Sequence, residues 1–295
     1  MFSYRHAFHA GNHADVFKHM VLLAILRHLV QKDSALMVFD THAGAGLYRL
    51  DGDYARTSGE AADGVLRLLK PQAQVPAAAP ALRDYLEVVA GFDPQQRIYP
   101  GSPFIVAQLL RERDKLKLFE WHPVDAKTLA AHVAQLDAKR HIAVLHEDGF
   151  VGLRKFLPPP TRRALVLCDP SYEIKTDYAR VVDTLADALA RFATGTYVVW
   201  YPIIARAEAH AMPHKLKTLA TKAGREWLHA SLTVKSSKLT LSASGDTVRP
   251  GLPASGMVVF NPPHTLKSAL ALALPELARQ LAQDRHASFT LEASG

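Results

Sequence analysis

The stretch ALVLCDPSYE, residues 164–173, joins a short apolar run to an Asp-Pro-Ser-Tyr tetrapeptide. The run Ala164–Cys168 contains no charge and is rich in leucine and valine, which is typical of a strand buried on both faces. Asp, Pro and Ser all favour turns, so the tetrapeptide alone is as compatible with an ordinary turn as with a site that presents Asp169 to a ligand. The elements around it decide between these two interpretations.

Apolar runs of the same kind alternate with helical patterns along most of the chain. We predict strands at 35–40, 115–120, 142–146, 164–168, 196–201, 227–234 and 256–261, and helices at 12–31, 177–193 and 202–223. Such alternation predicts an α/β fold with a mostly parallel, seven-stranded sheet and helices on both faces. An open sheet of this kind binds ligands at the carboxyl ends of its strands, which is where the tetrapeptide lies.

The segment 50–99 interrupts this alternation. It contains two helix-like pieces, SGEAADGVLRLLK and ALRDYLEVVAGF, joined by the low-complexity linker PQAQVPAAAPA. We therefore predict a helical insertion subdomain at 50–99 within a domain formed by 1–49 and 100–295. Residues 1–31 of that domain form an N-terminal motif and a helix, capped by Asn12, that cover the ligand site.

Composition sets broad limits on the function. The 295 residues carry a net charge of +7, which favours a polyanionic partner such as nucleic acid but equally describes a merely basic protein. The single cysteine, Cys168, excludes an intramolecular disulfide framework and fits a reducing compartment. No apolar segment is long enough for a transmembrane helix, and the N-terminus lacks the apolar region of a signal peptide. We expect a cytoplasmic protein with no membrane partner.

Three predicted strands end in groups that suit a nucleoside-bearing cofactor. FDTHAGAGLY places Asp40 at a strand end and Gly44 in a turn where a ligand can approach the backbone. The pattern lacks the third glycine of a dinucleotide fingerprint, and a lone Gly-x-Gly is as often a plain tight turn. In LFEWHP, Glu120 can accept hydrogen bonds from ribose hydroxyls, and in VLHEDGF, Asp148 and Gly149 can reach an adenine amine. These residues leave S-adenosylmethionine and NAD both open.

The Asp-Pro-Ser-Tyr turn suits the methylation of an exocyclic amine. The lone pair of such an amine is delocalised into the ring, and two acceptors that grip its hydrogens can direct the lone pair toward a methyl donor. The Asp169 carboxylate and the carbonyl of Pro170, stiffened by the proline ring, can form that pair. Tyr172 can stack on a base that has been flipped out of its own stack. The tetrapeptide after the fourth strand is therefore interpreted as an active site.

The chain resembles the bacterial 23S ribosomal RNA adenine-N6-methyltransferase J family. The resemblance rests on SYRHAFHAGNHADVFKH near the N-terminus, DTHAGAGLY, YPGSP at 99–103, LFEWHP and the Asp-Pro-Ser-Tyr turn, and it covers nearly the whole chain. It implies a Rossmann-like class I methyltransferase that transfers a methyl group from S-adenosyl-L-methionine to the N6 of a specific adenine in 23S ribosomal RNA. The product would be S-adenosyl-L-homocysteine, no metal would be needed, and we expect a monomer.

The resemblance also implies roles for individual residues. It places cofactor contacts at His19, His42, Ser102, Glu120, Asp148, Gly149 and Asp169. It makes Asp169 the catalytic acceptor and Tyr4 an RNA contact, with His6 and Lys18 as neighbours of that contact. The sequence departs from the family signature at Ser171, where a second proline is expected. This departure removes one fixed φ angle and restores a backbone N–H, but it leaves the Pro170 carbonyl in place.

Several alternatives stay open. A DNA adenine-N6 methyltransferase would share the signature, although no helix-turn-helix is evident, and a non-catalytic RNA-binding protein could keep the fold. An NAD-dependent oxidoreductase is disfavoured by the missing third glycine. His6, His9, His13 and His19 lack the spacing of a compact metal site, so we predict no metal. VKSSKLTLS at 234–242 and RTSGE at 56–60 are compatible either with phosphate contacts or with plain surface, and we interpret NPPH at 261–264 as a turn.

Overall fold

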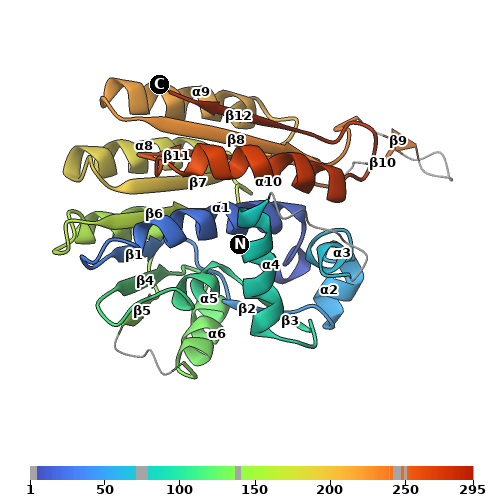
Figure 1. Cartoon of the computed structure of the whole chain (residues 1–295), viewed down its shortest axis with the longest axis horizontal. Helices are drawn as coiled ribbons and strands as arrows, with labels where there is room; N and C mark the ends of the chain where they lie inside the picture. Colours follow the sequence, from blue (N-terminus) through green and yellow to red (C-terminus); the bar gives the residue numbers. More distant parts are fainter. Residues whose placement is uncertain are drawn as a thin grey trace.

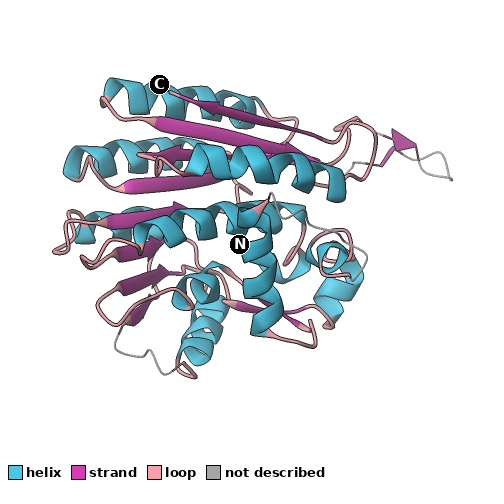
Figure 2. Cartoon of the chain, viewed as in Figure 1, coloured by secondary structure: helices cyan, strands magenta, loops and turns pink. Residues whose placement is uncertain are grey.

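The centre of the computed structural model is an eight-stranded sheet (Figures 1 and 2). The structure describes residues 5–70, 79–136, 141–238, 240–241, 247–248 and 251–294. In spatial order the strands are β12 (Ser288–Ala293), β8 (Trp227–Thr233), β11 (Ala254–Phe260), β7 (Thr196–Ile203), β6 (Ala164–Cys168), β1 (Met37–Asp40), β4 (Lys115–Phe119) and β5 (Ile142–Leu145). The α/β class is confirmed, and every predicted strand is present with small shifts at its ends.

The directions of the strands determine where their carboxyl ends lie. The strands β5, β4, β1, β6 and β7 pair in parallel. The strand β11 pairs antiparallel with both β7 and β8, so β8 runs in the same direction as β7. The carboxyl ends of six strands therefore meet at one edge of the sheet, which we call the carboxyl edge. The turns after β1, β4, β5 and β6 lie there, as the sequence predicts.

Two details of the sheet differ from the prediction. The prediction of seven strands is wrong because β12 adds an eighth, antiparallel to β8. β12 lies at the sheet margin and most of its side chains are exposed, so it lacks the apolar run that marks the other strands. The predicted helix 202–223 begins later, since β7 continues through Ile203 and α9 spans Ala207–Lys222.

Helices cover both faces of the sheet. One face packs on α1 (His13–Leu29), α4 (Pro80–Phe92), α5 (Ser102–Ala107), α6 (Pro123–Val133) and α10 (Leu266–Gln280). The other packs on α7 (Gly149–Gly152), the 3₁₀ helix η2 (Leu153–Phe156), α8 (Thr176–Arg191) and α9. Within the described residues, no helix combines the length and the apolar character needed to cross a bilayer.

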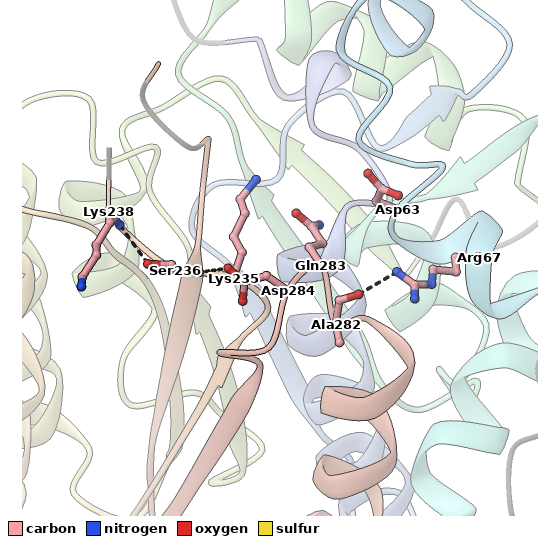
Figure 3. A pocket seen from close by; sticks show the side chains of 8 residues that line it. All are labelled: Asp63, Arg67, Lys235, Ser236, Lys238, Ala282, Gln283 and Asp284. Atoms are coloured by element: carbon pink, nitrogen blue, oxygen red, sulfur yellow. Dashed lines mark hydrogen bonds between the residues drawn. The ribbon is translucent and has the colours of Figure 1, made fainter. Parts of the chain in front are cut away.

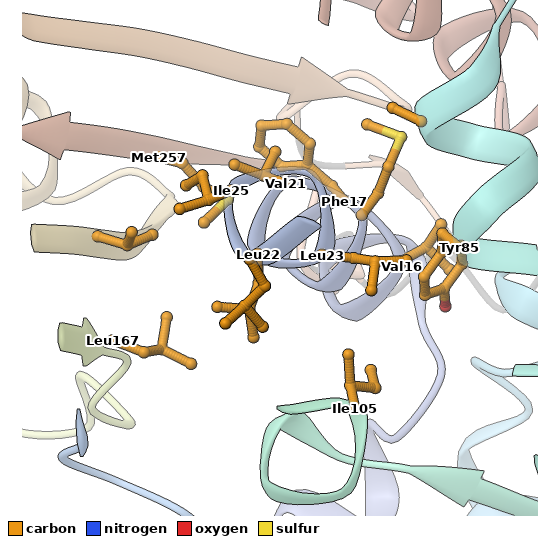
Figure 4. Packing of buried hydrophobic residues seen from close by; sticks show 14 of the residues in the cluster. Val16, Phe17, Val21, Leu22, Leu23, Ile25, Tyr85, Ile105, Leu167 and Met257 are labelled. Atoms are coloured by element: carbon orange, nitrogen blue, oxygen red, sulfur yellow. The ribbon is translucent and has the colours of Figure 1, made fainter. Parts of the chain in front are cut away.

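The helix α1 is buried on nearly all sides. The Asn12 side chain accepts hydrogen bonds from the backbone N–H groups of Ala14 and Asp15, which confirms the predicted cap. Figure 4 shows Val21 and Leu22 of this helix among side chains of the sheet and of α4 and α5. A helix that is apolar all round is a core element. The buried charged side chains of α1, Asp15 and Lys18, are therefore held in an environment that demands a partner.

The segment 50–99 contains α2 (Asp53–Ser58), α3 (Val65–Leu68) and α4, and it has a short strand on each side. β2 (Leu47–Arg49) and β3 (Ile98–Pro100) pair antiparallel and bring the two ends of the segment together. A further short pair, β9 (Thr240–Leu241) and β10 (Thr247–Val248), extends beyond β8. Most of the predicted linker, 71–78, lies outside the described residues, and the division into two subdomains stays a prediction.

Candidate active site

A buried ion pair joins α1 to the turn after β6. The Lys18 Nζ lies 2.5 Å from the Asp169 Oδ2 and 2.9 Å from the Asp15 Oδ1. The Lys18 side chain is 6% exposed and that of Asp169 is 14% exposed. Burial alone would lower the pKa of Lys18, but the two carboxylates outweigh it and raise that pKa. Lys18 is therefore held as a cation directly on the carboxylate of the Asp-Pro-Ser-Tyr turn.

Asp15 connects this ion pair to the N-terminal segment. Its Oδ2 lies 2.9 Å from the His6 Nε2 and accepts the backbone N–H of Gly11 at 3.0 Å. Burial would raise the pKa of Asp15, but the charges of His6 and Lys18, together with the hydrogen bond from His6, hold it well below its usual range. His6 belongs to the 3₁₀ helix η1 (His6–Phe8), and its ring lies edge-on to Tyr48, with 5.0 Å between the centroids. The structure thus brings together two of the three predicted RNA-binding residues, His6 and Lys18.

The acid at the end of β1 is buried beside this cluster. The Ser102 Oγ donates to the Asp40 Oδ2 at 2.6 Å, and the backbone N–H of His42 donates to its Oδ1 at 3.2 Å. Burial raises the pKa of Asp40 to about 6, against the lowering effect of these hydrogen bonds, and the negative charge of Asp169 adds to the rise. Ser102 comes from the first turn of α5, so two predicted cofactor contacts, Ser102 and His42, are both anchored to Asp40.

Glu120 faces the glycine turn after β1. Its Oε2 accepts the backbone N–H of Gly44 at 2.7 Å, and its Oε1 accepts the backbone N–H of His122 at 2.7 Å. Burial raises the pKa of Glu120, although these two hydrogen bonds oppose the rise. Gly44 has a φ of +62°, and a Cβ there would lie 2.2 Å from the Tyr48 hydroxyl, so a side chain at this position would strain the backbone and displace Tyr48. The structure therefore places Gly44 and Glu120 in direct contact, as expected of two parts of one cradle.

The turn after β5 brings a third acid to the same edge. The Asp148 Oδ1 accepts the backbone N–H of Phe150 at 2.9 Å, and its other oxygen is paired with the Arg180 guanidinium of α8. That guanidinium lies over the Phe150 ring, 4.3 Å from the centroid. The His42 ring meets Phe150 edge-on at 4.7 Å, and burial lowers the pKa of His42 to about 4, so this imidazole is neutral at pH 7. Asp148 therefore already has a cationic partner, which the sequence did not reveal.

Gly149 allows the turns after β1 and β5 to touch. A Cβ at Gly149 would lie 2.0 Å from the carbonyl oxygen of Thr41, so any side chain there would separate the two turns. The signal in the sequence was the Asp-Gly pair at the end of a predicted strand. This close backbone contact keeps His42 and Asp148 on adjacent turns.

His19 ends a buried chain of hydrogen bonds. Its Nδ1 lies 2.7 Å from the Tyr99 hydroxyl, which lies 3.0 Å from the Tyr85 hydroxyl. Its Nε2 is buried and has no hydrogen-bond partner among the residues that the structure describes. Burial and the charge of Lys18 lower the pKa of His19 well below its usual value, so the ring is neutral. A buried, unpaired imidazole nitrogen costs free energy unless a ligand supplies its partner.

Tyr172 occupies an unusual position. It has a φ of +53°, its side chain is 2% exposed, and its hydroxyl donates to the Trp200 carbonyl at 2.6 Å. Its ring packs against Tyr178, with 4.7 Å between centroids. The Trp200 ring, on β7, lies 5.9 Å from the Lys18 Nζ. Stacking of Tyr172 on a target base stays a prediction, and its ring is in the core in this structure.

The remaining sequence-based predictions concern residues away from this cluster, the thiol of Cys168 and metal binding. Tyr4 lies outside the described residues. Asn261 has a φ of +49°, and its side chain donates to the carbonyls of Ala193 and Gly195, so NPPH is a turn at the opposite edge of the sheet. Burial raises the pKa of the Cys168 thiol to about 12, which does not suit a nucleophile. The described ranges contain no group of three or more His, Cys, Asp or Glu residues placed to hold a metal.

Sequence reasoning missed three residues of this site: Asp15, Arg180 and Trp200. Asp15 lies in the first turn of the predicted helix 12–31, and no role in the site was predicted for it. Its i,i+3 spacing to Lys18 on an otherwise apolar helix was a signal that both charges are buried and paired. Arg180 and Trp200 come from other elements, and no local pattern marked them.

The fold and the site define a class I, Rossmann-like methyltransferase. A glycine turn follows β1, an acid follows β4, and an Asp-Pro-Ser-Tyr turn follows β6, all at the carboxyl edge. Residues 33–292 match the family described as "Ribosomal RNA large subunit methyltransferase D, RlmJ", and the chain belongs to this family of enzymes.

Individual relatives agree with this assignment. "Ribosomal RNA large subunit methyltransferase J" of Escherichia coli is 42% identical over 95% of this chain and 94% of the relative. The protein of the same name from Haemophilus influenzae is 38% identical over 99% of this chain and 98% of the relative. A crystal structure of a Legionella pneumophila protein superposes with a TM-score of 0.83 at 29% identity, covering 97% of this chain and 98% of that one.

Proposed function

We propose that this chain transfers a methyl group from S-adenosyl-L-methionine to the N6 of one adenine in 23S ribosomal RNA, releasing S-adenosyl-L-homocysteine. The observation that carries the proposal is the position of Asp169. Its carboxylate lies in a turn at the carboxyl edge and is paired with Lys18, and the turns that carry Asp40, Glu120 and Asp148 follow one after another along the same edge. This arrangement occurs in a chain that belongs to a ribosomal RNA methyltransferase family.

The residues around Asp169 fit the cofactor. The buried Nε2 of His19 lacks a partner among the described residues and can bond a polar group of the ligand. The Gly44 N–H orients Glu120 from the turn after β1, and Glu120 keeps lone pairs for ribose hydroxyls while two backbone N–H groups hold its orientation. When bound, the cofactor supplies an electrophilic methyl group on a sulfonium. His42, Ser102, Asp148 and Gly149 complete the proposed contacts.

The target amine would be held by the turn after β6. The Asp169 carboxylate and the Pro170 carbonyl accept hydrogen bonds from its two N–H groups. These bonds localise the nitrogen lone pair so that it can attack the methyl group. Positive charge develops on that nitrogen as its new bond to carbon forms, and Asp169 stabilises this charge until the surplus proton leaves to solvent. Lys18 stays charged because Asp15 holds it when Asp169 turns toward the amine. These steps do not require a metal.

The RNA would approach over the N-terminal segment. His6 and Lys18 lie beside Asp169 through their shared contact with Asp15, and we propose both, with Tyr4, as RNA contacts. Tyr172 would stack on the flipped base after its ring leaves the contact with Tyr178. We expect a monomer that acts in the cytoplasm, where ribosomal RNA is assembled into ribosomal subunits.

The proposal is tested with labelled S-adenosylmethionine. The protein and its Asp169→Ala variant are each incubated with unmodified 23S RNA, duplex DNA and assembled large subunits. We expect label in RNA, free or in a subunit precursor, with the wild-type protein alone. Label that enters only DNA, or that enters RNA equally with the variant, would contradict the proposal.

A further inference from the structure

A surface pocket lies between the insertion and the carboxyl end of β8. Its volume is about 540 Å³. Three segments far apart in the sequence line it, as Figure 3 shows: Asp63 and Arg67 from the insertion, Lys235, Ser236 and Lys238 after β8, and Ala282, Gln283 and Asp284 after α10. The reaction proposed above uses none of these residues.

The charges of the basic side chains in this pocket are not neutralised by carboxylates of the pocket. The Arg67 Nη1 donates to the carbonyl of Ala282 at 2.9 Å, so Arg67 is fixed in position without being neutralised. Lys235 and Lys238 form no ion pair within the described part of the chain. Three cations at one pocket, none of them bound to a carboxylate there, favour an anionic ligand.

The acids of the pocket offset this charge incompletely. Both carboxylate oxygens of Asp284 accept backbone N–H groups, from Ser236 at 2.8 Å and from His286 at 2.7 Å. These bonds fix the loop that carries Lys235 and Lys238, and they lower the pKa of Asp284. With Asp63 as the second acid, the lining still carries one more positive charge than negative charges. The carboxylate of Asp284 therefore organises the basic loop and does not pair with its lysines.

The pocket lies on the same edge of the sheet as Asp169. Lys235 follows the carboxyl end of β8, which runs in the same direction as β6. Between them in the sheet lie β7 and β11, which separates the two strand ends by three strand spacings. The end of β8 also lies level with Ile203, four residues beyond the partner of Cys168, so the two ends are about 20 Å apart. A nucleic acid whose base enters the site at Asp169 would have phosphates at about this range a few nucleotides away from that base.

A second connection runs along α1. The His13 Nε2 lies 2.9 Å from the carbonyl of Leu252, and the charge of Lys235 contributes to the lowered pKa of His13 after the larger effect of burial. The backbone N–H of Val234 also donates to the carbonyl of Pro253 at 2.9 Å, next to Leu252, so Lys235 lies close to the first turn of α1. Lys18 lies five residues further along the same helix, about 7.5 Å by the helical rise. The pocket and the Lys18–Asp169 pair thus lie along the first turns of one buried helix.

We infer that this pocket binds the phosphodiester backbone of the substrate RNA a few nucleotides away from the target adenine, with Arg67, Lys235 and Lys238 as phosphate ligands. The inference rests on the proposed function. Phosphate contacts fix the register of a nucleic acid without reading its sequence, and their free energy comes largely from the release of counterions. The pocket holds the backbone so that one base can be flipped toward Asp169.

Charge-neutralising variants test this inference. A Lys235→Gln/Lys238→Gln protein is compared with Lys32→Gln/Lys222→Gln, which loses the same charge from exposed positions after α1 and at the end of α9, on the opposite edge of the sheet. Binding to an unmodified 23S RNA transcript is measured without cofactor over a range of salt concentrations. We expect the pocket variant to bind about tenfold more weakly, with a salt slope smaller by about 2, and the control variant to match the wild type.

Two further probes test whether the pocket binds the backbone of a long RNA. A three-nucleotide RNA centred on adenosine is too short to reach the pocket, so it should bind the wild type and both variants equally. Inorganic phosphate tests whether the pocket takes a small free anion instead. Equal affinities of the two double variants for the long RNA, or a change confined to phosphate binding, would overturn the inference. Because binding is measured without turnover, a failure of the wild-type protein to methylate RNA would sink the proposed function separately.

Discussion

The two ends of α1 hold charged groups in different ways. At the carboxyl-terminal end, the Arg111 Nη1 donates to the carbonyls of Val30 at 2.6 Å and Lys32 at 2.7 Å. The Arg163 Nη2 donates to the carbonyl of Leu29 at 2.5 Å. The carbonyls of Leu29 and Val30 are ones that a helix end leaves without intrahelical partners, and cations there are stabilising. This end of α1 is a structural junction.

At the amino-terminal end, the charges point away from the helix backbone. Lys18 extends to Asp169, on an element 151 residues away, and the neighbouring His19 keeps a buried nitrogen without a partner among the described residues. Asp40 lies close by with a raised pKa. Such arrangements cost stability, which indicates that the amino-terminal end is organised for a ligand. A substitution of Asp169 should change chemistry more than stability, a substitution of Asp40 should change the pH dependence of stability, and substitutions at the other end should lower stability and leave the chemistry unchanged.

The largest expected effect is on the turn after β6. Asp169→Asn keeps the shape of the side chain but removes the negative charge that stabilises the methylated nitrogen. We expect kcat for RNA methylation to fall by at least about a hundredfold, with the cofactor still bound, because a preorganised electrostatic contact is worth about that much. Single-turnover transfer of labelled methyl gives the value. Asp183→Asn, at an exposed position on α8, is the control. An equal fall in kcat in the two variants would contradict a catalytic role for the charge of Asp169, and with it the distinction between the two ends of α1.

The second effect is a pH-dependent stability at Asp40. Its pKa rises from 3.8 to about 6 on folding, so the folded state binds the proton more tightly and loses stability as the pH rises from about 4 to about 6. Asp40→Asn cannot ionise. The variant should therefore gain stability relative to the wild type across this window, by about 3 kcal/mol at most. Urea unfolding at pH 4 and pH 7.5 measures the difference, and parallel pH profiles of the two proteins would contradict it.

A smaller effect is expected at the structural junction. Arg163→Met leaves the carbonyl of Leu29 without its donor and the carbonyl of Ser34 with Arg111 alone, which should lower the free energy of unfolding by about 1–2 kcal/mol. Arg162→Met, at the exposed neighbouring residue, provides the matched control. Methylation well below the unfolding temperature should be unchanged in both variants. A loss of turnover in Arg163→Met without a loss of stability would show that this end also serves catalysis.

The smallest effect is expected at Ser171. Its side chain is exposed, and the carbonyl proposed to hold the amine belongs to Pro170. Ser171→Pro restores the second proline of the family signature and should change kcat by less than about fivefold, since it adds rigidity and no new contact to the substrate. A hundredfold faster variant, measured with the same labelled transfer, would show that rigidity of this turn limits the reaction.

Much of the fold could be predicted because strands buried on both faces leave a continuous apolar signal. The prediction of Ala164–Cys168 matches β6 at both ends, and Asn12 caps α1 as expected. The end of β7 was missed because Pro202 normally ends a strand. Here the pairing of β7 with β6 stops at Val199, so Pro202 lies alongside β11 alone and behaves as an edge residue. The strand β12, at the sheet margin with exposed side chains, gave no comparable signal.

The candidate site could be predicted at its strand ends and less well elsewhere. Gly44, Glu120, Asp148 and Asp169 follow from one rule, that parallel strands present their carboxyl ends at a common edge. The rule cannot supply contacts from distant elements, such as Arg180 against Asp148. It also cannot supply the tertiary packing that places the Tyr172 ring in the core.

The role proposed for Asp169, directing methylation to the N6 of an adenine in 23S RNA, can be measured directly. The measurement is nucleoside mass spectrometry of unmodified 23S RNA after incubation with labelled S-adenosylmethionine and either wild-type or Asp169→Asn protein. We predict labelled N6-methyladenosine at one position with the wild type and at least about a hundredfold less with the variant. Label on another atom or base, or equal N6-methyladenosine with both proteins, would contradict this role.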